Sequence, residues 1–163
     1  MTHGERDRGE GVFEAATGDG PLPAAGDAET TESTEGARAA EVRAAFAGLS
    51  QIRRLSGAAG KPAAWEVARM VRAVALALEA AGLPPSALDP AGARAATGYR
   101  VRDADRPGAV VVEWLGPAGS GAAHEEEDRL RACARALTEA GWEALLYRGP
   151  RRRRFLEVEP GAG

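Results

Sequence analysis

Residues 99–115, with the sequence YRVRDADRPGAVVVEWL, decide the fold class of this chain. Tyr99 and Val101 alternate with two arginines, and such an alternation of apolar and polar residues predicts a half-buried β-strand. The run at 109–115 is more apolar and rich in β-branched residues, which predicts a strand nearer the centre of a sheet. The residues between the two runs, DADRPG, are typical of turns. The stretch therefore predicts a β-hairpin.

A second hairpin is predicted at the C-terminal end. Two further strand-like runs, at 142–148 and 153–158, are separated by a turn around Gly149-Pro150-Arg151. Between the two hairpins, a helix is expected from about residue 122 to a glycine cap at Gly141.

Two helices are predicted before the first hairpin. Between residues 36 and 56, five apolar side chains recur at steps of three and four, which indicates an amphipathic helix; they are Val42, Phe46, Leu49, Ile52 and Leu55. The second helix is expected to run without interruption from Pro62 to about Ala81, before Gly82 and two prolines. Because residues 73–78 include no polar side chain, this helix should be the most enclosed one.

This order of elements predicts an α+β fold. Two N-terminal helices precede a β-hairpin, a third helix and a second β-hairpin. The four strands are expected to form one mainly antiparallel sheet with helices on one face, which leaves the other face in contact with water.

The chain is predicted to divide into a disordered acidic N-terminal arm at 1–35, a single α+β domain at 36–159 and a disordered tail at 160–163. The arm has too few apolar residues to offset the entropy lost on ordering. It contains nine acidic residues and two arginines, whereas the rest of the chain contains 19 basic and 15 acidic residues. The formal net charge of −3 therefore hides an acidic arm on a mildly basic body.

Two helical segments resemble each other in sequence. RAVALALEAAGL at 72–83 and RACARALTEAGW at 131–142 match at seven of twelve aligned positions, and each precedes a predicted pair of strands. A duplicated helix-hairpin unit is one explanation. The other is that two Ala- and Arg-rich helices with glycine caps look alike by composition, since one short match is thin evidence for a repeat.

No cofactor or metal site is recognisable. The glycines at 116–121 are spaced G-x-x-G-x-G rather than G-x-G-x-x-G, and the acidic residues that follow would repel a phosphate. His124 could share a metal ion with Glu127 or Asp128, but a site needs three or four convergent ligands and the only other histidine is His3.

No catalytic constellation is recognisable either. Cys133 lies on the apolar face of a predicted helix and is expected to be a small buried side chain rather than a nucleophile. Glu113 is the one carboxylate that the pattern places partly inside the fold, and an ion pair with Arg100 or Arg102 across the hairpin is the favoured arrangement. We therefore expect a non-catalytic protein without a cofactor.

The strongest local signal is a cluster of arginines at the tip of the second predicted hairpin. Such a ribbon can follow nucleic-acid phosphates or bind an acidic partner. Arginine also protects exposed hairpin edges from aggregation, and 20 of the 21 basic residues of this chain are Arg, which weakens the signal. The candidate contact residues are Arg148, Arg151, Arg152, Arg153 and Arg154.

Two functions are favoured by these observations, ahead of an enzyme with an unfamiliar site. The first is a non-catalytic intracellular protein-binding or regulatory module, with Tyr99, Trp114 and Trp142 as partner-facing aromatics on the free face of the sheet. The alternative is a nucleic-acid-binding accessory protein that uses the arginine hairpin, with the acidic arm as an intramolecular competitor. A cytoplasmic location without membrane contact is expected, because the single cysteine cannot form an internal disulfide and neither a signal peptide nor a membrane span is recognisable.

Overall fold

The computed structural model describes residues 13–23, 27–57 and 59–161. Its helices are α1 (Ala28–Leu55), α2 (Ala64–Ala68), α3 (Met70–Ala80), α4 (Ala122–Glu139) and a short 3-10 turn, η1 (Pro150–Arg152). Its strands are β1 (Ala87–Leu88), β2 (Arg94–Ala96), β3 (Gly98–Asp103), β4 (Val110–Leu115), β5 (Trp142–Arg148) and β6 (Arg154–Pro160). No helix in these described ranges is both long and apolar enough to cross a membrane.

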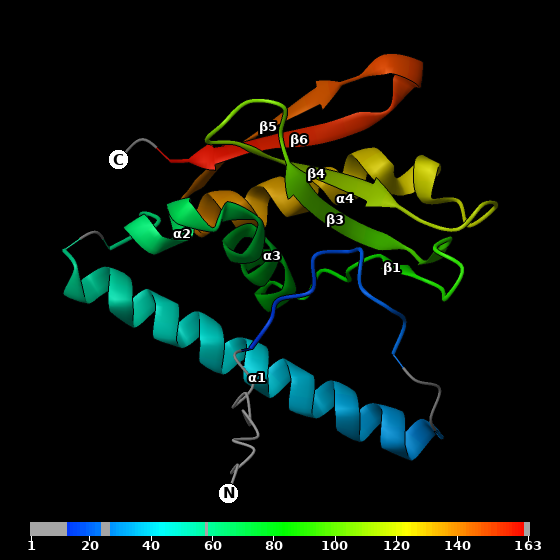
Figure 1. Cartoon of the computed structure of the whole chain (residues 1–163), viewed down its shortest axis with the longest axis horizontal. Helices are drawn as coiled ribbons and strands as arrows, with labels where there is room; N and C mark the ends of the chain where they lie inside the picture. Colours follow the sequence, from blue (N-terminus) through cyan, green and yellow to red (C-terminus); the bar gives the residue numbers. More distant parts are fainter. Residues whose placement is uncertain (1–12, 24–26, 58, 162–163) are drawn as a thin grey trace, which may run out of the picture.

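The four longer strands form one antiparallel sheet in the order β3-β4-β6-β5. Helices α3 and α4 pack against one face of this sheet, and α1 packs on the outer side of α3, so the structure has three layers (Figure 1). The predicted α+β fold is confirmed. The sequence patterns gave no sign of the additional two-stranded sheet formed by β1 and β2.

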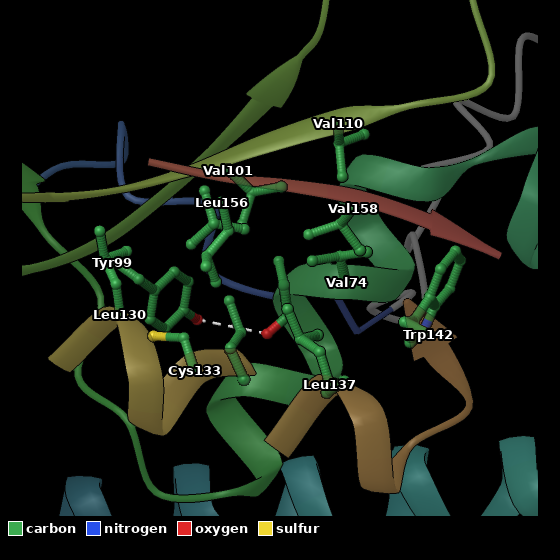
Figure 2. Packing of buried hydrophobic residues seen from close by; sticks show 14 of the residues in the cluster. Val74, Tyr99, Val101, Val110, Leu130, Cys133, Leu137, Trp142, Leu156 and Val158 are labelled. Atoms are coloured by element: carbon green, nitrogen blue, oxygen red, sulfur yellow. Dashed lines mark hydrogen bonds between the residues drawn. The ribbon is translucent and has the colours of Figure 1, made fainter. Parts of the chain in front are cut away.

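The core lies between the sheet and the two inner helices. Alternate residues of the strands point toward α3 and α4, where their side chains meet the apolar faces of both helices (Figure 2). Residues 73–78 are all buried, so α3 is the enclosed helix that its composition predicts. Fully buried members of the core are Val74, Ala75, Leu78, Tyr99, Val110, Val112, Leu130, Cys133, Leu137, Leu156 and Val158.

Helix α1 begins eight residues before the predicted start at Gly36, because the Asp27 side chain caps it by accepting a hydrogen bond from the backbone N–H of Thr30. Its buried positions are Val42, Leu49 and Arg53, and not Ile52 as the pattern suggested. The reason is the helical period of 3.6 residues. Repeated steps of three drift away from the buried stripe, and the next position on that stripe after Leu49 is an arginine.

The N-terminal arm differs from the prediction in two ways. Residues 28–35 belong to α1, and residues 13–23 lie along the folded body instead of forming a disordered segment. The backbone N–H of Val101 donates to the carbonyl of Thr17 at 2.7 Å, and the Tyr99 hydroxyl donates to the carbonyl of Ala16 at 2.7 Å. Backbone hydrogen bonds, the ion pairs of Asp19 with Arg94 and Arg100, and the packing of Phe13 and Ala15 order this segment. Composition alone does not reveal these contacts. Residues 1–12 and 24–26 of the predicted arm lie outside the described residues.

The C-terminal tail also differs from the prediction over part of its length. Strand β6 extends to Pro160, and the backbone N–H of Gly161 donates to the carbonyl of Gly141 at 3.0 Å. This bond continues the ladder between β5 and β6 by one step. Residues 162–163 lie outside the described residues.

The second predicted helix is broken into α2 and α3 at Arg69, whose φ of −137° and ψ of 55° are not helical. The break turns the short α2, so that Glu66 points inward and Val67 is exposed. Glu66 is held there by Arg53 of α1. A tertiary ion pair thus overrides the continuous helical pattern of residues 62–81.

The topology contains two similar units, α3-β3-β4 and α4-β5-β6. Each contributes one edge strand and one central strand, and the central strands β4 and β6 pair with each other antiparallel. Val74 and Cys133 occupy equivalent positions in the two aligned helical segments, as do Leu78 and Leu137, and all four are fully buried. This symmetry favours the duplication hypothesis, although composition alone would also bring small and apolar residues to the core.

Candidate functional site

The three aromatic residues predicted to face a partner are buried in the core. Tyr99, Trp114 and Trp142 lie on the inward side of their strands, so the prediction that they form an exposed binding face is wrong. Burial raises the pKa of the Tyr99 hydroxyl, and the Trp114 Nε1–H donates to Glu125 Oε1 at 3.2 Å. The strand patterns were identified correctly, and the alternation of Tyr99 and Val101 with two arginines already indicates that Tyr99 faces the core, so its assignment to the free face conflicted with that pattern.

Ion pairs between strands cover much of the outer face of the sheet. Glu113 on β4 lies 2.9 Å from Arg102 and 3.5 Å from Arg100, which confirms the expected pairing across the first hairpin. Arg106, in the loop of that hairpin, reaches the β6 carboxylates Glu157 and Glu159. Long charged side chains therefore lie over the strands β3, β4 and β6.

The outer face of the second hairpin is more apolar. Leu145 and Tyr147 of β5 are 49% and 43% exposed. The Tyr147 ring stacks on Phe155 of β6, with ring centroids 5.8 Å apart and an interplanar angle of 25°. These three residues, called the apolar strip below, alternate along the strands with side chains that point inward.

Strand β5 has a free edge. Hydrogen bonds from Gly149 N to Arg153 O (2.6 Å) and from Gly161 N to Gly141 O (3.0 Å) flank its ladder with β6. Hydrogen-bonded and non-hydrogen-bonded pairs alternate in an antiparallel ladder, so the odd-numbered residues of β5 bond to β6. The even-numbered residues direct their N–H and C=O groups away from β6, and these groups have no backbone partner among the described residues; they are Trp142, Ala144, Leu146 and Arg148.

The opposite edge of the sheet, along β3, is covered. Tyr99 N donates to the carbonyl of Pro84, Ser86 N donates to the carbonyl of Tyr99, and Val101 N donates to the carbonyl of Thr17, all at 2.9 Å or less. Extended segments of the same chain thus occupy the β3 edge. The second helix-hairpin unit has no such covering segment among the described residues.

Four of the five arginines predicted to contact nucleic acid or an acidic partner are exposed at or beside the hairpin tip. These are Arg148, Arg151, Arg152 and Arg153, and none of them forms an ion pair within the described part of the chain. Arg151 and Arg152 both have positive φ, near 60°, which is uncommon for residues other than glycine.

Arg154 is bound differently from the other four. Its guanidinium lies 3.4 Å from Glu127, and its backbone N–H donates to Glu126 Oε1 at 2.7 Å. Glu127 also accepts a hydrogen bond from Arg131, which, with the charge of Arg154, lowers the pKa of its carboxyl. The acidic first turns of α4 therefore anchor the base of the tip and leave Arg154 out of the exposed cluster.

Other candidate chemical groups are not assembled into a site. His124 is exposed, and Glu127 is engaged by arginines. Cys133 is a buried free thiol whose pKa is raised to about 12 by burial. Within the described ranges, no three His, Cys, Asp or Glu side chains are grouped so that they could hold a metal ion.

One open depression lies at the start of β5. It has a volume of about 530 Å³, and its lining includes Lys61, Thr138, Gly141, Trp142 and Glu143. The buried Nε1–H of Trp142 has no acceptor among the described residues. Small-molecule sites are usually concave pockets that bury most of their ligand, and this open depression does not have that form.

Comparison of the chain with protein-family models, with curated proteins and with solved structures finds no match. The geometry is therefore the basis for any functional proposal. It brings together a free strand edge, the apolar strip and the arginine tip, all on the hairpin formed by β5 and β6.

Sequence reasoning identified the arginines but missed the edge of β5 and the exposed Leu145. A signal was present in WEALLYR at 142–148. Positions 143, 145 and 147 share one face, and two of them are apolar although the outer face was expected to be in contact with water. The strand also lacks the Lys and Pro residues that often protect edges.

Proposed function

We propose that this protein is a non-catalytic protein-binding or regulatory module that binds through its C-terminal hairpin. The observation that carries the proposal is the free edge of β5 beside the exposed Leu145 and Tyr147. A strand edge with unpaired backbone groups binds an additional strand, while neighbouring side chains provide selectivity. The Arg residues at the tip favour a partner with acidic groups near one end of its strand.

A cytoplasmic location belongs to this proposal. The single cysteine, Cys133, is a buried free thiol, which suits a reducing compartment. Catalysis is not part of the proposal, because the site offers hydrogen-bonding backbone, apolar surface and positive charge but no paired acid and base.

Site-specific photo-crosslinking tests the proposal. A photoreactive amino acid replaces Leu145 on the hairpin in one variant and Leu55 at the end of α1 in the control variant. Leu55 is 82% exposed, so the two probes are both accessible. After irradiation in cells that make the protein, the position 145 probe should form crosslinks to a protein at least tenfold more often than the position 55 probe. Equal crosslinking from both positions would contradict the proposal.

The unpaired arginines support a second candidate function, binding to nucleic acid at the hairpin tip. Each phosphate contact would release counterions and make the affinity salt-dependent. Of the described residues of the predicted arm, 13–23 are bonded to α1, α3, β1 and β3, and 28–35 form the first turns of α1. Residues 1–12 are therefore the segment tested as the proposed competitor.

A fluorescence titration against labelled duplex and single-stranded DNA, at low and physiological salt, tests this second candidate. The chain with and without residues 1–12 is compared with a variant in which Arg148, Arg151, Arg152 and Arg153 are changed to Gln. Binding that falls with salt and is lost in the variant supports nucleic-acid recognition. Absence of salt-dependent binding for both unsubstituted chains contradicts it.

A further inference from the structure

The free edge of β5 has the geometry of a self-complementary interface. Four residues of β5 direct their backbone N–H and C=O groups away from β6, at every second position: Trp142, Ala144, Leu146 and Arg148. The ladder between β5 and β6 is regular from end to end without a bulge. Natural edge strands are usually interrupted or covered, because a regular free edge is a template for pairing with another chain. Among the residues that the structure describes, segments of the same chain cover the β3 edge in that way and none covers the β5 edge.

We infer that the partner of this edge is a second copy of the chain, whose β5 pairs antiparallel with the first to form a continuous eight-stranded sheet. The inference rests on the proposed binding role of the hairpin and names its partner. A two-fold axis at Leu145 sets the register. In that register Trp142 pairs with Arg148 of the second copy, and Ala144 pairs with Leu146 of the second copy. The free backbone groups of all four residues then gain hydrogen bonds. If the register between the two copies of β5 shifted by two residues in either direction, the residue at one end of the edge would have no partner.

The charges along β5 favour this antiparallel direction. One end of the strand leads to the four unpaired arginines at or beside the tip, and the other end carries the exposed Glu143, with the exposed Glu139 just before it in the chain. Antiparallel pairing places the arginine tip of each copy near the acidic end of the other. Parallel pairing would place the two arginine tips together, where like charges repel.

The apolar strip becomes continuous in the same arrangement. Leu145 of one copy lies directly opposite Leu145 of the second copy, because residues on the two-fold axis face each other. Tyr147 and Phe155 extend the strip on both sides. Side chains that are half exposed in one copy therefore find apolar neighbours on the outer face of the joint sheet.

Charged substitutions at Leu145 test the inference on the full-length chain. Sedimentation equilibrium of the wild type should give twice the 16.9 kDa mass of one chain. Leu145→Lys and Leu145→Glu should each give the mass of a single chain, because like charges would then lie opposite each other. An equimolar mixture of the two variants should recover the doubled mass. Leu55→Lys, the same change at an exposed site on α1, should leave the dimer intact.

Amide hydrogen exchange supplies a second measurement that does not depend on substitution. The N–H groups of Ala144 and Leu146 should exchange at least tenfold more slowly at high protein concentration than at low concentration. Circular dichroism of each variant checks that the substitution leaves the fold unchanged.

Two results would overturn the inference: a wild type with the mass of one chain at high micromolar concentration, or a Leu145→Lys variant that keeps the doubled mass. The proposed binding role is judged separately by the crosslinking experiment. If the wild type is a single chain and the probe at position 145 still captures a different protein, self-pairing is wrong and the binding role stands. If the wild type is a single chain and the probe captures nothing above the position 55 control, both are wrong.

Discussion

Arg53 of α1 and Glu66 of α2 form an ion pair in which both side chains are buried. Arg53 Nη2 lies 2.6 Å from Glu66 Oε1, and Arg53 Nε lies 2.8 Å from Glu66 Oε2. The remaining polar groups are also satisfied, since Arg53 Nη1 donates to the carbonyl of Ala140 and Glu66 Oε2 accepts from the backbone N–H of Ala63. The pair therefore joins α1 and α2 to the C-terminal end of α4.

We expect the loss of either partner of this pair to destabilise the fold strongly. Glu66→Ala and Arg53→Met should each lower the free energy of unfolding by about 3–5 kcal/mol, because each leaves a buried charge without its partner. The double variant should be less destabilised than the sum of the two changes. Urea unfolding measures all three, and Arg131→Ala, which removes an exposed ion pair to Glu127, should leave the free energy of unfolding almost unchanged. Additive effects of Arg53→Met and Glu66→Ala would contradict this account.

The glycines that end α3 and α4 provide a matched pair of substitutions. Gly82 and Gly141 have φ of 83° and 92°, which glycine adopts more readily than other residues. A Cβ at Gly82 would meet no atom within 4 Å, whereas one at Gly141 would lie 2.3 Å from the carbonyl oxygen of Gly60. Gly82→Ala should therefore cost about 1 kcal/mol. Gly141→Ala should lower the free energy of unfolding by at least about twice as much, as measured by thermal or urea unfolding. Equal losses for the two variants would show that the backbone near Gly60 moves aside without a cost in stability.

Stability should fall as the pH rises above about 9. Burial raises the pKa of the Cys133 thiol from 9.0 to about 12, so above pH 9 the unfolded chain loses a proton that the folded chain keeps. The contribution of the protonated thiol to the free energy of unfolding is complete below this pH. It is lost progressively toward pH 12, by about 1.4 kcal/mol per pH unit. Burial also raises the pKa of Tyr99, whose ionisation in the unfolded chain is half complete near pH 10.

Cys133→Ala should flatten the fall of stability between about pH 9 and 10, where the ionisation of Tyr99 contributes less to it than that of Cys133. Urea unfolding of the wild type and the variant at about pH 8, 9 and 10 measures the slope. The cavity left by the smaller side chain lowers stability equally at each pH. A slope that is the same in both proteins would show that the thiol does not cause the decline.

The segment at 13–23 should contribute measurably to stability. Deletion of residues 1–20 removes the carbonyl acceptors of Tyr99 and Val101, together with the contact of Phe13 with the Arg38 guanidinium, which lies 4.4 Å from the ring centroid. We expect a loss of at least about 2 kcal/mol relative to a chain that lacks only residues 1–12, because these hydrogen bonds and the apolar packing of Phe13 and Ala15 are lost. Tyr99→Phe should account for about 1 kcal/mol of the loss. Equal stability of the two truncated chains would contradict the docking of this segment.

Local sequence patterns predicted most of the elements of the sheet and the helices on one face. The alternation at Tyr99 and Val101, and the β-branched run after it, correspond to β3 and β4. The break at Arg69 was not predictable, because it accompanies the tertiary ion pair of Glu66 with Arg53. The start of α1 at Ala28 follows from the local cap at Asp27, a signal that the prediction missed. For the candidate site, the pattern identified the arginine tip. The prediction that three aromatic residues lie on the free face of the sheet was wrong, because these residues are buried.

The sequence by itself determined most of the helices and the four long strands, because periodicity, capping and glycine or proline stops act over only a few residues. It also determined the concentration of arginine at the second hairpin. The tertiary structure alone decided which strand edge is covered and which is free. That outcome depends on hydrogen bonds between residues far apart in the chain, such as Thr17 with Val101, and on the packing of helices that turns Trp142 inward and leaves Leu145 outside.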